Sequence, residues 1–234
     1  MSNNKENTQV IDNTLNSDII PRVNEFSLNK QDSTNSSKSN SSRGKDKIYG
    51  KIHLILGPMF SGKSTELLRL VNRCHYKRKT TICVSYSMDN RYSDNDCVVT
   101  HDRTEYPAIK AKNISSIRDK IEQYDVIGID EGQFYPDLVE QCEELCNMGK
   151  TVIIAALSGN FKRESFDTIA RIIPKSDIIQ NINAICFDCD EDATFTLRLT
   201  NETSEVLIGG EESYKPACRG CHVKYTNKKI VSDN

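Results

Sequence analysis

The sequence predicts an α/β fold in which helices wind around a parallel β-sheet, joined to a small cysteine-bearing second domain. Three observations support this prediction. An octapeptide at 57–64 fits the G-x-x-x-x-G-K-[S/T] pattern of a phosphate-binding loop. Apolar strand patterns alternate with helical patterns between residues 52 and 157, as in wound α/β domains. Two Cys-x-x-Cys pairs follow residue 184 and indicate the small domain.

The octapeptide lies between a short apolar strand, 52–56, and the start of a helix, 64–71. Glycines let the backbone approach a polyphosphate, and backbone N–H groups with the helix N-terminus bind its negative charge. Lys63 supplies a charge toward the β- and γ-phosphates, and Ser64 supplies a hydroxyl for Mg²⁺. The alternative is a glycine-bearing turn without a ligand. The expected phosphate contacts are Gly57, Pro58, Met59, Phe60, Ser61, Gly62, Lys63 and Ser64.

Further elements follow from hydrophobic periodicity. Apolar residues recur at helical spacing in two segments, and Gly149 is the expected stop of the second one. The last apolar run is suited to the centre of a parallel sheet. The expected elements are a strand over 80–86, a helix over 114–124, a strand over 125–130, a helix over 137–148 and a strand over 151–157.

Composition divides the chain. Residues 1–47 are rich in Asn, Ser, Asp and Lys without a sustained apolar period, which predicts a disordered tail. We expect the α/β domain at 48–184, a zinc-binding domain at 185–225 and a C-terminal tail at 226–234.

Charge and cysteine content restrict the class of protein. The net charge of −2, without a dense Lys/Arg stripe, argues against a nucleic-acid binder. No signal peptide and no membrane span is recognisable, so we expect a cytoplasmic protein without a membrane partner. In a reducing compartment the nine cysteines favour free thiols or a metal site over disulfides.

The apolar strand 125–130 ends in the segment Asp130-Glu131-Gly132-Gln133. In a protein with a phosphate-binding loop such a strand ends beside the phosphates, where Asp130 can hold Mg²⁺ opposite Ser64. Glu131 can then face the acceptor and serve as the general base. The alternative is an acidic turn after a core strand, but together with the loop the segment is expected to belong to the nucleotide site.

The paired cysteines Cys186, Cys189, Cys218 and Cys221 are typical of a closed structural zinc site. Free thiols in turns and an iron–sulfur cluster are the alternatives. His222 is adjacent to Cys221, but four cysteines already complete a tetrahedral site, so we expect His222 not to bind the metal.

A cation is also needed to offset charge on the transferring phosphoryl group. Arg91 and Arg103 both lie in the polar stretch after the second strand. Their spacing does not distinguish them from each other, and each could equally be a solvated surface arginine.

With these motifs in order, the chain from about 52 to 225 closely resembles the cytosolic type of thymidine kinase. The resemblance implies a RecA-like sheet and a zinc-binding lasso domain. It also implies Mg²⁺- and ATP-dependent phosphorylation of the 5′-hydroxyl of deoxythymidine, and of deoxyuridine, with Glu131 as catalytic base. A homotetramer inhibited by dTTP is implied as well.

The family pattern also implies site residues. Asp89, Asn90 and Arg91 match the phosphate-donor site, which favours Arg91 over Arg103 as the catalytic cation. Phe161 and Tyr214 match nucleoside contacts, although ordinary core packing is the alternative. The positions matching the lasso that binds the base are Glu205, Val206, Leu207, Ile208 and Gly209, and those matching the lining near the thymine methyl are Met59, Leu157, Thr196 and Phe166.

The chain departs from the family at two positions. Ser158 stands where the family usually has an acid, and Glu205 replaces a commonly apolar residue. The tripeptide Lys5-Glu6-Asn7 in the tail resembles a degradation signal, although three residues are a weak match. An ATP-driven nucleic-acid-binding module is the main alternative function, but the net charge does not suggest it. A GTPase is less favoured, because no Asn-Lys-x-Asp motif is present within the expected folded part, 48–225.

Overall fold

The computed structural model describes residues 49–87, 97–99, 105–202, 204 and 209–232. These residues belong to one compact unit, Lys45–Asn234. The predicted tail at 1–47, with its Lys5-Glu6-Asn7 tripeptide, lies outside the described residues.

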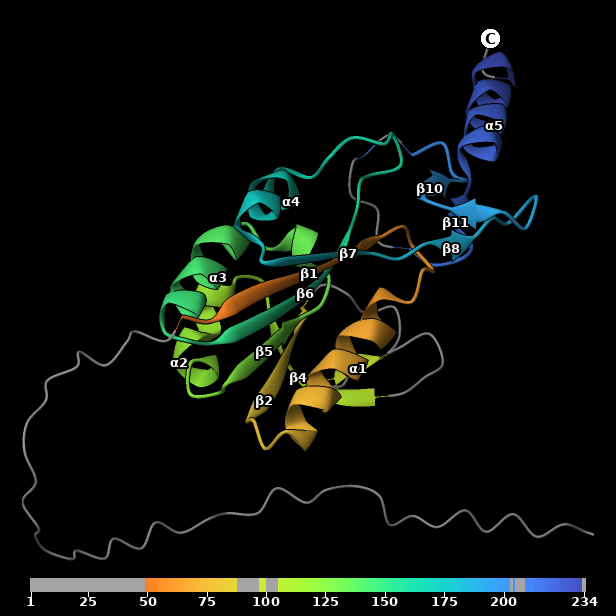
Figure 1. Cartoon of the computed structure of the whole chain (residues 1–234). Coiled ribbons are helices and arrows are strands. Elements are labelled where there is room, and N and C mark those ends of the chain that lie inside the picture. Colours follow the sequence, from red (N-terminus) through yellow and green to blue (C-terminus); the bar gives the residue numbers. More distant parts are fainter. Residues whose placement is uncertain (1–48, 88–96, 100–104, 203, 205–208, 233–234) are drawn as a thin grey trace, which may run out of the picture. The chain divides into compact units, whose positions relative to one another are not determined.

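A seven-stranded sheet in the order β3-β4-β2-β5-β6-β1-β7 forms the centre of the unit (Figure 1). Neighbouring strands are parallel, except for the antiparallel pair β3 and β4. This confirms the predicted wound parallel sheet. The strands are β1 (Lys51–Gly57), β2 (Thr81–Tyr86), β3 (Cys97–Val99), β4 (Glu105–Ala111), β5 (Val126–Ile129), β6 (Thr151–Leu157) and β7 (Ile178–Asn181).

The register brings the ends of three strands together. Gly57 at the end of β1 pairs with Leu157 at the end of β6, and Ile129 at the end of β5 pairs with Ile154 of β6. β6 therefore lies between the strand that precedes the loop and the strand that precedes Asp130.

Helices cover both faces of the sheet. On one face α1 (Lys63–Tyr76) packs Leu67 and Val71 against strand residues such as Ile55. The other face carries η1 (Ile114–Ile117), α2 (Arg118–Ile121), α3 (Leu138–Asn147), α4 (Asp167–Ile172) and η3 (Ile173–Lys175) (Figure 1). Leu54 and Ile55 enter opposite cores because successive strand side chains point to opposite faces.

The predicted helix ends are only partly confirmed. α3 ends at Asn147, and Gly149 follows with a φ of 85°, so the glycine stop is confirmed. The helix expected over 114–124 is instead the short 3₁₀ turn η1 followed by four residues of α2. The Asp137 carboxylate accepts hydrogen bonds from the N–H groups of Ile114 and Ser115, which fixes the start of η1.

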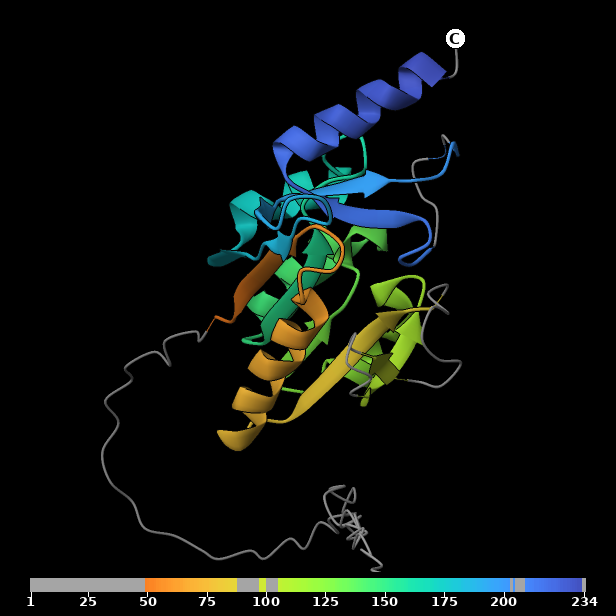
Figure 2. The ribbon, with the colours of Figure 1, turned by 90° about the vertical axis from the view of Figure 1, so that its right-hand side faces the viewer.

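Residues 184–232, called the C-terminal module below, form smaller elements around their own apolar cluster. Leu197 and Ala217 lie in this cluster together with Cys186 and Cys221. The elements are the paired strands β8 (Ala184–Ile185) and β9 (Asp192–Ala193), the paired strands β10 (Phe195–Arg198) and β11 (Tyr214–Ala217), and α5 (Arg219–Ser232). α5 runs across residue 226, where a tail was expected to begin (Figure 2).

Two further predictions can be compared with this arrangement. Cys83 and Cys142 are fully buried and Cys146 packs against the same core as Cys142, as expected of core cysteines. Within the described ranges, none of the helices combines the length and apolar character needed to span a membrane.

Candidate active site

The loop between β1 and α1 holds a backbone shape that side chains would block. Gly62, the N-cap of α1, has a φ of 82°, and Phe60 has a φ of 65°. A Cβ at Gly57 would lie 2.3 Å from the carbonyl oxygen of Ile182, so glycine is needed at this position. The sequence-predicted loop is therefore present as a strand-to-helix turn.

Lys63 and Ser61 hold the loop from within. The Lys63 ammonium donates to the carbonyl of Pro58 at 2.6 Å, and the Ser61 hydroxyl donates to the same carbonyl at 2.9 Å. The Lys63 side chain thus folds back across the loop, where a bound polyphosphate would compete with the Pro58 carbonyl for its charge.

Ser64 and Asp130 meet although they are far apart in the sequence. The Ser64 hydroxyl lies 3.0 and 2.9 Å from the two carboxylate oxygens of Asp130, and the N–H of Glu131 donates to one of them at 3.1 Å. A hydroxyl and a carboxylate in this arrangement are the oxygen ligands that Mg²⁺ takes in phosphate-loop proteins. The donor set therefore fits Mg²⁺.

The electrostatics of Asp130 also suit a cation. Burial and then the nearby charge of Glu131 raise the pKa of Asp130 to about 7, against the opposing effects of Ser64 and Lys63. A divalent cation beside the carboxylate would favour its ionised form.

Glu131 is held in a defined position. Its φ of 54° is left-handed, and its carboxylate accepts a hydrogen bond of 2.5 Å from the side-chain amide of Gln133. The Gln133 side-chain oxygen in turn accepts from the N–H of Leu157 at 3.0 Å. A Cβ at Gly132 would lie 2.6 Å from Ile154, so only glycine allows this turn to pack on β6. Gln133, predicted as a nucleotide contact, is thus placed as the support of Glu131.

The phosphate loop also contacts the C-terminal module. The N–H of Met59 donates to the Thr196 hydroxyl at 3.0 Å, and Thr196 is buried in β10. These are two of the residues expected near the thymine methyl. Leu157 lies at the end of β6, beside Gln133. A loop residue and a module residue predicted for the same pocket are therefore adjacent.

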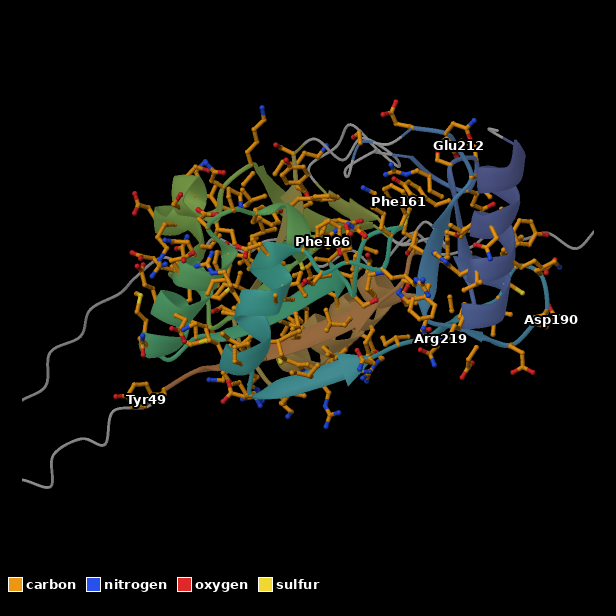
Figure 3. All side chains as sticks on the ribbon, turned by 90° about the horizontal axis from the view of Figure 1, so that it is seen from above. Tyr49, Phe161, Phe166, Asp190, Glu212 and Arg219 are labelled. Atoms are coloured by element: carbon orange, nitrogen blue, oxygen red, sulfur yellow. The ribbon has the colours of Figure 1, made fainter. Side chains whose placement is uncertain are left out.

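The predicted aromatic contacts separate into two groups. Phe161 lies beside the C-terminal module, where the guanidinium of Arg198 is 3.8 Å from its ring centre and donates to the Tyr214 hydroxyl at 2.6 Å (Figure 3). Phe166 instead packs on Phe134, with ring centres 6.5 Å apart. Phe161 and Tyr214 are thus brought together through Arg198, while Phe166 belongs to the edge of the larger core.

The four predicted metal ligands form one cluster. The sulfur atoms of Cys186, Cys189, Cys218 and Cys221 all lie within 4.8 Å of one another. The Cys189 sulfur is 3.6 Å from both the Cys218 and the Cys221 sulfurs. A tetrahedral zinc–thiolate site has sulfurs about 3.8 Å apart, given a Zn–S distance of about 2.3 Å. The donor set therefore fits a structural Zn²⁺.

His222 is not part of this cluster among the described residues. Its Nε2 atom lies 3.1 Å from the carbonyl oxygen of Phe161. The expectation that His222 is not a metal ligand agrees with this geometry.

A family model described as "Thymidine kinase" matches residues 50–222.

The chain belongs to the thymidine kinase family.

Its relatives in this family cover most of its length. "Thymidine kinase 1" of Dictyostelium discoideum is 44% identical over 178 residues, which are 75% of this chain and 78% of that protein. "Thymidine kinase" of Sheeppox virus (strain KS-1) is 47% identical over 174 residues, 74% of this chain and 97% of that protein. "Thymidine kinase" of Vaccinia virus (strain Ankara) is 45% identical with the same coverage.

One solved structure shows a weaker likeness. The flagellar accessory protein FlaH from Methanocaldococcus jannaschii is 14% identical, with a TM-score of 0.41 over 69% of this chain and 77% of that chain. A likeness of this size adds nothing to the family assignment, which depends on the sequence comparisons alone.

Some predicted thymidine kinase site residues lie outside the described part of the chain. On the donor side these are Asp89, Asn90, Arg91 and the alternative Arg103; on the nucleoside side they are Glu205, Val206, Leu207 and Ile208. Gly209 is described and buried. The divergent Ser158 lines a pocket of about 330 Å³ that also borders Pro58 and Thr196.

Sequence reasoning missed Arg198 and Asp188 at these sites, and it considered His222 only as a possible metal ligand. Arg198 and His222 both contact Phe161. Asp188 accepts hydrogen bonds from the Cys221 thiol at 3.3 Å and from Lys224 and Tyr225 of α5 at 3.0 and 3.1 Å. Arg198 could have been noticed as an arginine within the strand β10, and Asp188 as an acid between Cys186 and Cys189.

Proposed function

We propose that this thymidine kinase transfers the γ-phosphoryl group of ATP to the 5′-hydroxyl of thymidine, giving dTMP and ADP. The observation that carries the proposal is the double attachment of the phosphate loop. Ser64 joins it to Asp130 on the metal side, and Met59 joins it to Thr196 on the nucleoside side. The donor and acceptor sites therefore share one rigid segment.

On the donor side, the loop N–H groups and Lys63 would bind the phosphates of ATP, while Ser64 and Asp130 would hold Mg²⁺. Mg²⁺ neutralises charge on the β- and γ-phosphates when it is bound. We further propose Arg91, with Asp89 and Asn90, as donor-site residues. This assignment depends on the family resemblance.

On the acceptor side, Glu131 would accept the proton of the 5′-hydroxyl. The hydroxyl oxygen bonds to the γ-phosphorus while the bond to the β–γ bridging oxygen breaks, and ADP leaves. Gln133 supports this role because its amide donates to one Glu131 oxygen and so orients the carboxylate.

For the nucleoside we propose contacts with Phe161, Tyr214 and the segment 205–209, and a methyl pocket that includes Met59, Leu157, Thr196 and Phe166. A site that encloses a methyl group and hydrogen-bonds a pyrimidine edge should prefer thymidine, accept deoxyuridine less well and reject purines. We propose a role in salvage of deoxynucleotides for DNA synthesis in the cytoplasm, as a homotetramer inhibited by dTTP.

A substrate panel tests the function. Purified protein with ATP and Mg²⁺ is expected to convert thymidine to dTMP, deoxyuridine more slowly, and deoxycytidine and deoxyguanosine at least about 100-fold less efficiently by kcat/KM. Product formation is followed by chromatography. The proposal would be overturned by phosphorylation of deoxyguanosine but not thymidine, or by ATP hydrolysis that only DNA stimulates.

The zinc site gives a second prediction. Cys186→Ser removes one of four thiolates, so zinc content should fall well below the roughly one ion per chain expected of the parent protein. The affinity for thymidine should fall with it, because β10 and β11 belong to the same small core as the cysteines. Elemental analysis and calorimetric titration measure the two quantities.

Cys74→Ser is the matched control for this prediction. Cys74 lies in α1, outside the four-cysteine cluster. A Cys186→Ser protein that keeps its zinc, or that loses zinc and binds thymidine as before, would contradict the proposed structural role.

A further inference from the structure

Arg198 is an almost fully buried arginine at the junction of the two parts of the protein. Only 3% of its surface is exposed, and its guanidinium lies 3.8 Å from the Phe161 ring centre and 5.2 Å from that of Tyr214. Its NH2 group donates to the Tyr214 hydroxyl, and its NH1 group donates to the carbonyls of Glu202 and Ser204. One planar cation therefore fixes two aromatic side chains and the backbone after β10.

His222 holds Phe161 from another direction. A carbonyl oxygen only accepts hydrogen bonds, so the contact of 3.1 Å between Nε2 and the Phe161 carbonyl places the ring proton on Nε2. The ring itself is buried, with 3% exposure, and packs edge-on against Phe195 at a centroid distance of 5.9 Å. Phe161 is thus held at its ring by β10 and at its backbone by α5.

We propose that Arg198 and His222 are positioning residues that fix Phe161 to the C-terminal module and thereby set the affinity for the nucleoside. This inference rests on the proposed function, in which Phe161 and Tyr214 contact thymidine. Neither positioning residue needs to touch the substrate. Their effect is to order the two aromatic side chains before the nucleoside arrives, so that binding does not have to order them.

The chemistry at position 198 favours arginine specifically. A guanidinium can stack on an aromatic face while its N–H groups, which lie in the same plane, reach several acceptors at once. An ammonium concentrates its charge on one nitrogen and cannot reach Glu202, Ser204 and Tyr214 together while also staying close to the centre of the Phe161 ring. Lysine should therefore replace only part of this function.

The experiment compares Arg198→Met and Arg198→Lys in the zinc-loaded full chain. Arg198→Met should raise the KM for thymidine and its calorimetric Kd at least about tenfold, since a desolvated cation–π contact and several hydrogen bonds are lost. The kcat at saturating thymidine and the KM for ATP should stay within about twofold. Arg198→Lys should raise the KM for thymidine by an intermediate factor.

Lys162→Met is the matched control. Lys162 places a cation 5.7 Å from the same Phe161 ring, but its side chain is exposed. A solvated cation at this distance contributes little, so the KM for thymidine should change by less than about twofold.

His222 provides an independent test of the same idea. His222→Phe removes the donor to the Phe161 carbonyl and should raise the KM for thymidine several-fold, with zinc content unchanged. His222→Gln keeps an N–H donor and should recover part of the affinity. Loss of zinc in both variants would instead make His222 part of the metal site and overturn this role.

The remaining outcomes also decide the inference. An unchanged KM for thymidine in Arg198→Met would overturn it, as would a fall in kcat without a change in KM. If Arg198→Met does not fold, Arg198→Lys decides, because a lysine variant with the parent KM contradicts the proposed need for a planar cation. A parent protein that is inactive on thymidine would overturn the proposed function itself, which is a separate result.

Discussion

Glu131→Gln is expected to lower kcat for thymidine phosphorylation by about 10²–10⁴-fold, because an amide cannot accept the proton of the 5′-hydroxyl. The fold should be preserved, since glutamine keeps an oxygen that can accept the hydrogen bond from Gln133. The KM for ATP should change little, because Glu131 is proposed to face the acceptor and not the phosphates of ATP. Steady-state kinetics and single-turnover measurements together separate the chemical step from product release.

Glu143→Gln is the control for this prediction. Glu143 lies on α3 and pairs with Lys175 on the surface, so its loss should leave kcat within about twofold. A Glu131→Gln protein that is folded and retains the parent kcat would show that Glu131 is not the base.

Asp130→Asn is expected to have opposite effects on activity and stability. Activity should fall by about 10³-fold or more, since a ligand of the proposed Mg²⁺ site is neutralised. The metal-free protein, however, should become more stable at pH 8, because the buried Asp130 carboxylate must otherwise be kept ionised there. The gain in free energy of unfolding should be on the order of 3 kcal/mol, or roughly 5–10 °C in Tm.

The gain in stability of Asp130→Asn should depend on pH, because it comes from the titration of the Asp130 carboxyl group. The pKa of Asp130 is about 7 in the folded protein and 3.8 for the unperturbed group. The folded state therefore binds the proton more tightly, and the native protein loses stability as pH rises from about 4 to about 7. The advantage of Asp130→Asn should be full at pH 8 and should disappear near pH 4.

Thermal unfolding at several pH values without divalent cations measures this advantage. Saturating Mg²⁺ should reduce it at pH 8, because the cation stabilises only the parent carboxylate. Equal Tm values for Asp130→Asn and the parent protein at pH 8 would contradict an elevated pKa for Asp130.

The sequence predicted the parts of the fold whose signals are local. β1, β2, β5 and β6 were predicted because central parallel strands are continuous apolar runs. β4 was not, since Glu105–Ala111 contains Pro107 and Lys110, and neither was β7, where Ile178 and Ile179 are largely exposed at the sheet edge. The edge strand β7 buries less surface, and in β4 the proline and the lysine interrupt the apolar pattern.

The C-terminal helix illustrates a different limit. α5 has weak apolar periodicity, and it is held near its start by Cys221 and by contacts of Lys224 and Tyr225 with Asp188. Long-range contacts of this kind are not visible in the local residue pattern. The helix was therefore not predicted.

The same distinction applies to the candidate site. The phosphate loop, Asp130-Glu131 and the paired cysteines could be identified because each motif is contiguous or nearly so. The support of Glu131 by Gln133 and Leu157, and of Phe161 by Arg198 and His222, joins separate strands and loops. Such pairs depend on register and packing, which the sequence alone did not provide.

Two residues of the candidate active site are held in a left-handed backbone conformation before any substrate binds. Phe60 and Glu131 both have positive φ, a conformation that costs a non-glycine residue about 1–2 kcal/mol. Packing of the sheet must supply that free energy during folding, before any nucleotide is present. The turns are then already shaped when substrates bind, so reorganisation contributes less to the activation barrier. The protein therefore gives up some free energy of unfolding to hold these turns, and in return its activation barrier is lower. Mutations that relax either turn should raise the free energy of unfolding and lower kcat.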